Sequence, residues 1–165
     1  MGRTWYSSLE YRNRLETLAD TVTTLGLGAD IIVGFPGETE EDFEETLQVV
    51  AEARYDQAFT FLFSPRPGTA AAELTDLFVD PDVAQDRYER LIAVQNRVSL
   101  EKNQEEVGRV LEILVEGPSR KDPEVITARS RGNKVVHVPG HHDPGTFLQA
   151  RIEGAARHHL LGAVL

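Results

Sequence analysis

The chain has no cysteine among its 165 residues. This absence excludes disulfides, thiolate nucleophiles and cysteine-ligated zinc or iron-sulfur clusters within the chain. The chain also lacks an apolar run close to the roughly 20 residues that a membrane span needs. Residues 1–5 show no hydrophobic core of a signal peptide. We therefore expect a cytoplasmic protein without a membrane partner.

Positive charge is scarce overall, because the net charge is -10. Its distribution along the chain is uneven. Residues 1–106 hold 9 Lys and Arg against 21 Asp and Glu, whereas residues 107–165 hold 8 against 6, together with all five His. Such an asymmetry suggests two units with different partners, and the second is the better candidate for binding RNA. Chance variation in surface charge is the alternative.

The first part alternates helix and strand signals. Residues 7–10 form a capping box, a hydroxyl and a carboxylate three residues apart, which predicts a helix over residues 8–25. The apolar run over residues 29–35 predicts a strand buried on both faces, as in a parallel sheet. Thr39, followed by acids, predicts the start of a second helix, and residues 58–63 predict a second strand. This order is typical of a βαβ arrangement.

The pattern changes after a long helix predicted from Pro81 to about Glu106. Five short apolar runs then predict strands of a small β-barrel, at residues 110–115, 125–128, 134–138, 147–152 and 159–165. The chain thus divides into an α/β part, residues 1–106, and an all-β part, residues 107–165. Two βα units cannot close a barrel, so we expect the first part to be the end of something larger.

Two loops follow the predicted strands of the first part. Residues 34–38 form a Gly-rich turn, where a ligand can approach the backbone closely. Arg66 stands in a proline-framed loop, residues 64–69, and could hold a carboxylate or a phosphate. Two structural alternatives remain open. The first loop could be a tight turn, and Arg66 could pair with the acidic surface.

Basic residues gather around a predicted hairpin in the second part. Residues 129–137 offer three cations and an Asn at a turn, which suits contacts to folded RNA. The alternative is that these residues only balance acids elsewhere. The candidate RNA-binding residues are Arg120, Lys121, Arg129, Arg131, Asn133, Lys134 and His137.

The five histidines invite a metal-site hypothesis. Neighbouring histidines, as at His141 and His142, point to opposite faces of an extended strand, and no cysteine accompanies them. We favour surface or RNA-facing histidines over a metal site.

Two motifs together resemble a known family. Residues 34–43 (GFPGETEEDF) and residues 63–71 (FSPRPGTAA), at this separation, are similar to the radical-SAM tRNA methylthiotransferases. Residues 87–95 on the following helix are similar to that family as well, and the segment around Arg129 matches its N6-isopentenyladenosine branch.

The resemblance implies a fold and a set of sites. It implies a segment of a partial TIM-like radical-SAM barrel followed by a small OB-like TRAM barrel that binds RNA. The full-length enzyme would hold S-adenosylmethionine and two [4Fe-4S] clusters, and its partner would be the tRNA anticodon stem-loop. The cofactor-binding residues implied in this chain are Gly34, Pro36, Gly37, Glu38 and Arg66.

The chain departs from the family in lacking every cluster cysteine. We therefore expect no catalytic residue in it and no catalysis by the chain alone. The start of the chain resembles an internal stretch of the family, which predicts a truncated reading frame, a mis-called start or a split gene whose N-terminal part is a separate chain. The sequence leaves the oligomeric state open.

Three other hypotheses remain at this point. The chain could be a stand-alone TRAM-type RNA-binding module. It could belong to the threonylcarbamoyladenosine branch of the same family. The third alternative is a phosphate-binding βα enzyme that uses the turn at residues 34–39. This hypothesis requires the chain alone to bind a phosphate ligand, and we expect that it does not.

Overall fold

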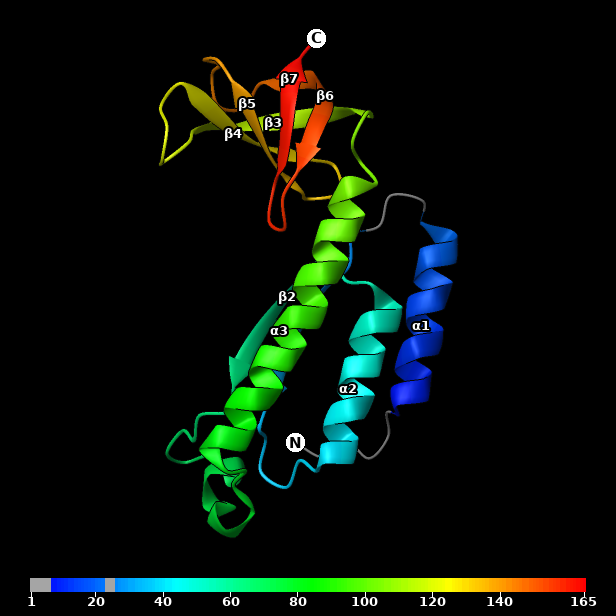
Figure 1. The fold of residues 1–165 in the computed structure, drawn as a ribbon, viewed down its shortest axis with the longest axis vertical. Helices are drawn as coiled ribbons and strands as arrows, with labels where there is room; N and C mark the ends of the chain where they lie inside the picture. Colours follow the sequence, from blue (N-terminus) through cyan, green and yellow to red (C-terminus); the bar gives the residue numbers. More distant parts are fainter. Residues whose placement is uncertain (1–6, 23–25) are drawn as a thin grey trace. The chain divides into compact units, whose positions relative to one another are not determined.

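The computed structural model describes residues 7–22 and 26–165. These residues divide into two compact units. The first unit contains residues 7–22 and 27–96, and the second contains Gly26 and residues 97–165. Each unit is described by itself below, and Figure 1 labels their helices and strands.

The first unit consists of helices and two strands in alternation. Its elements are α1 (Ser8–Thr21), β1 (Gly28–Val33), α2 (Glu40–Ala53), β2 (Gln57–Leu62), two short 3-10 turns, Ala70–Glu73 and Thr75–Leu77, and the start of α3 (Pro81–Gln104). This order confirms the helix and strand predictions. The first two helices begin at capping boxes, Ser7 with Glu10 and Thr39 with Asp42.

The helix α1 is shorter than predicted. It ends at Thr21, and Val22 is already extended with φ -123° and ψ 104°. Residues 21–24 are Thr-Val-Thr-Thr, a run of β-branched side chains that lose rotamer freedom in a helix. The predicted helical residues 23–25 lie outside the described part of the chain.

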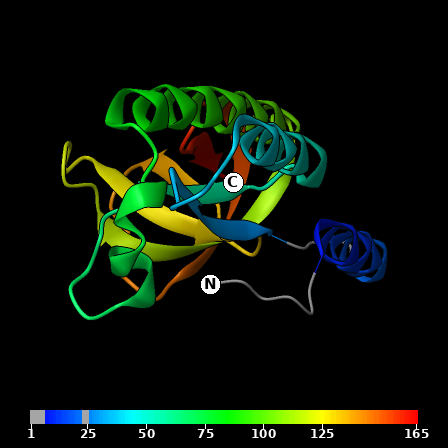
Figure 2. The same cartoon turned by 90° about the horizontal axis from the view of Figure 1, so that it is seen from below.

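The strands β1 and β2 pair in parallel, with Gly28 opposite Gln57 and Val33 opposite Leu62. Helices α2 and α3 lie over one face of this pair (Figure 2). Side chains from the sheet and the helices form the core on that face, and its fully buried members are Val33, Phe43, Val50, Tyr55 and Leu91. The hydroxyls of Tyr11 and Tyr55, 2.5 Å apart, link α1 to this core.

The other face of the pair is bare, which corrects the prediction of a strand buried on both faces. Ile32 is 54% exposed, Phe59 56% and Phe61 52%. The alternation of a strand sends these side chains away from the helices. No described residue of the first unit covers them, because its helices pack on the opposite face. We call Ile32, Phe59 and Phe61 the bare sheet face.

The second unit is a closed five-stranded barrel. Its strands are β3 (Val110–Pro118), β4 (Val125–Ser130), β5 (Val135–Pro139), β6 (Phe147–Ala155) and β7 (Leu160–Val164). They follow the order β3-β4-β5-β7-β6, and β3 pairs with β6 to close the barrel. The five predicted strands and the small barrel are therefore confirmed.

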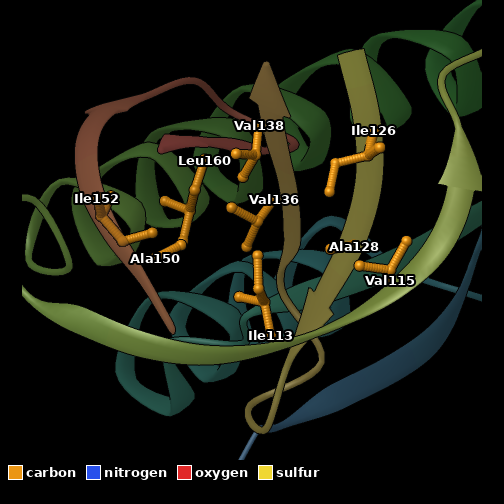
Figure 3. Close-up of a cluster of buried hydrophobic side chains, with 9 residues drawn as sticks. All are labelled: Ile113, Val115, Ile126, Ala128, Val136, Val138, Ala150, Ile152 and Leu160. Atoms are coloured by element: carbon orange, nitrogen blue, oxygen red, sulfur yellow. The ribbon is translucent and has the colours of Figure 1, made fainter. Parts of the chain in front are cut away.

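Alternate residues of each strand point into the barrel. Figure 3 shows the resulting core, which consists of Ile113, Val115, Ile126, Ala128, Val136, Val138, Ala150, Ile152 and Leu160. Four strands run further than predicted, namely β3 to Pro118, β4 to Ser130, β5 to Pro139 and β6 to Ala155. The two longest, β3 and β6, each contain a register shift just before a glycine, Gly117 or Gly154. A bulge of this kind lets a strand bend and continue around a small barrel.

Candidate functional site

The parallel pairing brings the two predicted ligand loops to the same edge of the sheet. The loop at residues 34–38 follows β1, and the loop at residues 64–69 follows β2. The amide of Phe63 donates to the carbonyl of Val33 at 2.8 Å, which holds the two strand ends together. The ring of Phe63 also packs edge-on against Phe35 and Phe78, with centroids 5.4 and 5.7 Å away.

The two glycines of the first loop are required by its backbone. Gly34 has φ +73°, and a Cβ there would lie 2.8 Å from the Cβ of Ala84. Gly37 has φ +84°, and its amide donates to the carbonyl of Leu77 at 2.7 Å. Pro36 between them is buried. A residue other than glycine at Gly34 or Gly37 would strain this turn, so the shape of the turn depends on the two glycines.

The carboxylate of Glu38 is engaged within the protein. It accepts from the amide of Gly34, at 3.1 and 3.2 Å to its two oxygens, and from Nη1 of Arg87 at 2.9 Å. Arg87 is only 5% exposed, and it also donates to the Glu38 carbonyl at 3.1 Å and to Glu40 at 3.1 Å. Glu38 therefore shapes the turn with its side chain.

Arg87 is a residue of this site that sequence reasoning did not single out. It comes from α3, and the acids that it binds surround the start of α2. Its neighbour Arg90 pairs with Glu40, Asp86 and Glu44. The hydrogen bond from Arg90, with a smaller contribution from Arg87, lowers the pKa of Glu40 below its ordinary value. The cluster of acids around the start of α2 was the signal that an arginine should face it.

Arg66 differs from Arg87 in being exposed. Its carbonyl accepts from the amide and the hydroxyl of Thr69, which shapes the loop. Within residues 7–22 and 26–165, nothing forms an ion pair with its guanidinium. Arg66 therefore presents a free cation at the edge where β1 and β2 end.

The hairpin arginines of the barrel are paired with carboxylates of β3. Nε of Arg129 lies 2.9 Å from Glu116, and its Nη1 donates to the carbonyl and the side-chain oxygen of Asn133, both at 3.2 Å. An Nη of Arg131 lies 2.6 Å from a carboxylate oxygen of Glu112. The alternative that these residues balance acids elsewhere thus has direct structural support. Asn133 adopts φ 61°, which closes the hairpin.

Within the described part of the chain, Lys134 and His137 do not share the carboxylate partners of the hairpin arginines. Nζ of Lys134 donates to Oδ1 of Asn103 at 2.9 Å, and Asn103 donates to the carbonyls of Ala156 and Arg157 at the β6–β7 turn. The ring of His137 lies 4.9 Å from that of His159, centroid to centroid. The predicted RNA-binding residues therefore differ in their partners within the protein.

Arg120 and Lys121 lie exposed in the connection between β3 and β4. Across the described chain, no carboxylate pairs with either of them, nor with Arg157 at the β6–β7 turn. Arg157 was missed by sequence reasoning, because a lone arginine near the end of the chain carries no local signal.

His159 lies in a cationic environment. Its pKa is lowered, first by burial and then by the charges of His137, His158 and Lys121. Among the described residues, no group of three or more His, Cys, Asp or Glu could hold a metal ion. In the same part of the chain, no helix is long and apolar enough to cross a membrane.

Comparisons with known proteins give these sites a context. The TRAM domain model matches residues 104–165. The chain is 45% identical over 161 residues to the tRNA-2-methylthio-N(6)-dimethylallyladenosine synthase of Desulforamulus reducens, which covers 97% of this chain and 35% of that protein.

Other relatives agree. The synthase of Mycobacteroides abscessus is 44% identical over 165 residues, with 94% of this chain and 32% of the relative covered. The synthase of Streptomyces coelicolor is 46% identical over 168 residues, with 97% and 33% covered. The chain thus spans about a third of the length of these curated relatives. The resemblance found in the sequence is confirmed: the chain is a homologue, over nearly all of its length, of tRNA-2-methylthio-N(6)-dimethylallyladenosine synthases and carries a TRAM domain at residues 104–165.

Proposed function

We propose that the chain is part of a tRNA methylthiotransferase that adds a methylthio group to C2 of N6-isopentenyladenosine next to the anticodon. The observation that carries this proposal is the identity of 44–46% to synthases of that name across 94–97% of the chain. The whole enzyme would act in the cytoplasm on the anticodon stem-loop of tRNA.

The first part, residues 1–106, is in this proposal a segment of a partial TIM-like radical-SAM barrel. The parallel pairing of β1 and β2 and the helices on one face are what such a segment requires. The bare sheet face supports the proposal, because Ile32, Phe59 and Phe61 are more than half exposed. In a complete barrel, apolar side chains on this face would lie in the interior.

The strand-end loops are the proposed S-adenosylmethionine site. Gly34 and Pro36 are buried and hold the shape of the turn, whereas Gly37 is exposed and leaves room for a ligand near the backbone. The free guanidinium of Arg66 suits a carboxylate. Glu38 contributes by holding the turn through Arg87. When bound, the cofactor would supply the radical chemistry of the reaction.

Two [4Fe-4S] clusters belong to the whole enzyme in this proposal. The residues of this chain do not fit a cluster, because the chain has no thiolate. We therefore assign cluster ligation to a further segment of the enzyme, present in the same polypeptide or as a separate chain. By itself the chain is proposed to bind RNA without catalysis.

The second part, residues 107–165, is the proposed RNA-binding domain. Its support is the TRAM match together with the exposed cations of the barrel, Arg120, Lys121 and Arg157. Arg129, Arg131, Asn133, Lys134 and His137 are the further proposed contacts. Lysine and arginine neutralise phosphates, so binding should weaken steeply with salt.

A chimera tests the catalytic part of the proposal. The matching third of the Desulforamulus reducens synthase is replaced by this chain, and methylthiolated nucleosides of tRNA are measured by mass spectrometry in cells that lack their own synthase. We expect the modification to be restored. A chimera with Gly34→Val, which clashes with Ala84, is the matched control and should be inactive. A folded chimera that binds tRNA without modifying it would contradict the proposal.

A binding titration tests the RNA part. Fluorescence anisotropy of the unaltered chain with a labelled anticodon stem-loop, with and without N6-isopentenyladenosine, is followed as a function of salt. We expect affinity that falls steeply as salt rises. Binding that is absent at low salt would contradict RNA recognition by this chain alone.

A further inference from the structure

A second group of basic side chains on the barrel adjoins the paired hairpin arginines, because His137 lies two positions along β5 from Val135, the strand partner of Arg129. We call it the imidazole surface, and it consists of Lys121, His137, Arg157, His158 and His159. Its members come from three places, namely the β3–β4 connection, β5 and the β6–β7 turn.

Contacts within the barrel hold this surface together. The rings of His137 and His159 meet edge to face at 4.9 Å. The amide of Ala156 donates to the carbonyl of His159 at 2.8 Å, which makes a tight turn with Arg157 and His158 at its exposed tip. Asn103 anchors the same turn by donating to the carbonyls of Ala156 and Arg157, at 2.7 and 3.3 Å.

The imidazole surface carries positive charge that is not neutralised within the described chain. No carboxylate there forms an ion pair with Lys121, Arg157 or His158. The groups that act electrostatically on His159 are His137, His158 and Lys121, and all of them disfavour its protonation. A surface with uncompensated cations attracts a polyanion without first releasing an internal partner.

The hairpin arginines, in contrast, have their charges neutralised by carboxylates of the barrel. Arg129 pairs with Glu116 at 2.9 Å and Arg131 with Glu112 at 2.6 Å. A phosphate that binds either arginine must compete with a carboxylate and lies near a negative charge. Exposed ion pairs are individually weak, about 0–1 kcal/mol, so the competition reduces phosphate binding without abolishing it.

We propose that the imidazole surface makes the main phosphate contacts between the barrel and RNA, ahead of Arg129 and Arg131. This inference rests on the proposed RNA-binding function and adds the position of the contact. A phosphate beside the imidazole rings favours their charged form, so RNA binding takes up protons and strengthens as the pH falls.

Two double variants of the whole chain test the position of the contact, because each removes two positive charges. They are K121A/R157A, on the imidazole surface, and R129A/R131A, on the hairpin. Each is titrated against a labelled anticodon stem-loop by fluorescence anisotropy at about 50 mM and about 200 mM salt. Thermal unfolding by circular dichroism checks that both variants are folded.

We expect K121A/R157A to weaken binding about tenfold and to flatten the salt dependence, since two phosphate contacts are lost. R129A/R131A should weaken binding less than about threefold. The reverse ranking, or equal losses, would overturn the inference while leaving RNA binding intact. Absence of binding by the unaltered chain would instead overturn the RNA part of the proposed function, and this inference with it.

A third variant, H137Q/H159Q, separates the histidines from the general charge. The affinity of the unaltered chain should rise between about pH 8 and about pH 6, and this variant should lose most of that rise. Thermal unfolding by circular dichroism checks that this variant is folded. A pH dependence that the variant retains in full would overturn the role of the two rings.

Discussion

The two units of this chain complete their sheets in different ways. The barrel pairs every one of its five strands on both sides and buries its apolar residues in one interior. The described part of the first unit has two strands, and its helices cover a single face. Its other face exposes Ile32, Phe59 and Phe61.

This difference teaches where each unit obtains its stability. A closed barrel leaves no strand edge and needs no further partner. An isolated two-stranded sheet buries little surface, so the first unit depends on its helices and on the ion pairs around the start of α2. Four predictions can break or sharpen this comparison.

The largest effect is expected from Arg87→Ala. Arg87 is 5% exposed and binds Glu38 and Glu40, so its loss leaves a carboxylate without its buried partner. Such a loss costs about 3–5 kcal/mol. Hydrogen exchange measured by mass spectrometry should show loss of protection in α2, whereas the barrel strands keep theirs. Arg90→Ala, at a half-exposed position, is the control and should cost about 1 kcal/mol or less. Equal effects of the two variants would argue against a special role of Arg87.

Two truncations of apolar side chains contrast the barrel interior with the bare sheet face. Ile113→Ala creates a cavity in the barrel core, because Ile113 is fully buried, and should cost about 2–5 kcal/mol. Phe61→Ala removes a side chain that is already half exposed and should change stability by about 0.5 kcal/mol or less. Urea unfolding measures both. A large cost at Phe61 would mean that another surface covers this face, as self-association of the chain could do.

Thr39→Ala tests the start of α2. The Thr39 hydroxyl accepts from the amide of Asp42 at 3.2 Å, and its loss should cost about 1 kcal/mol. Thr46→Ala on the same helix is the control, since the Thr46 hydroxyl only donates to a carbonyl one turn back. Thermal unfolding should separate the two variants, and an equal shift would show that the cap is not what stabilises α2.

The smallest expected effect is on the pH dependence of the stability of the barrel, through His159. Burial and neighbouring cations lower the pKa of His159 below its ordinary value of 6.5. The unfolded chain then binds the proton more readily, so stability is complete above about pH 6.5 and falls as the pH drops toward the lowered pKa. His159→Gln should reduce this fall in urea titrations between pH 7 and pH 5. An unchanged slope would assign the acid sensitivity to other groups.

Local patterns predicted much of the fold. The capping boxes at Ser7 and Thr39 marked the starts of α1 and α2, and apolar alternation marked all five strands of the barrel. These signals work because a cap or a strand depends on residues within a few positions of one another. The predicted end of α1 was wrong, because a run of β-branched residues outweighed the helical spacing of its leucines.

The strand-end loops show what local sequence patterns could and could not predict about the candidate site. The order of elements predicted that the loops at residues 34–38 and 64–69 follow neighbouring strands, and parallel pairing places them at one edge. That Glu38 turns inward to Arg87 could not be predicted, because the two residues are 49 positions apart.

The sequence by itself determined the helices, the strands, the lack of any thiolate and the relationship to the methylthiotransferases, because each of these is carried by local spacing, composition or motifs. Only the tertiary structure decided which charges remain free. Arg129 and Arg131 meet carboxylates on β3, whereas Lys121 and Arg157 face solvent. Ion pairing depends on which side chains the closed barrel brings within a few ångströms of one another, and strands distant in sequence supply those neighbours.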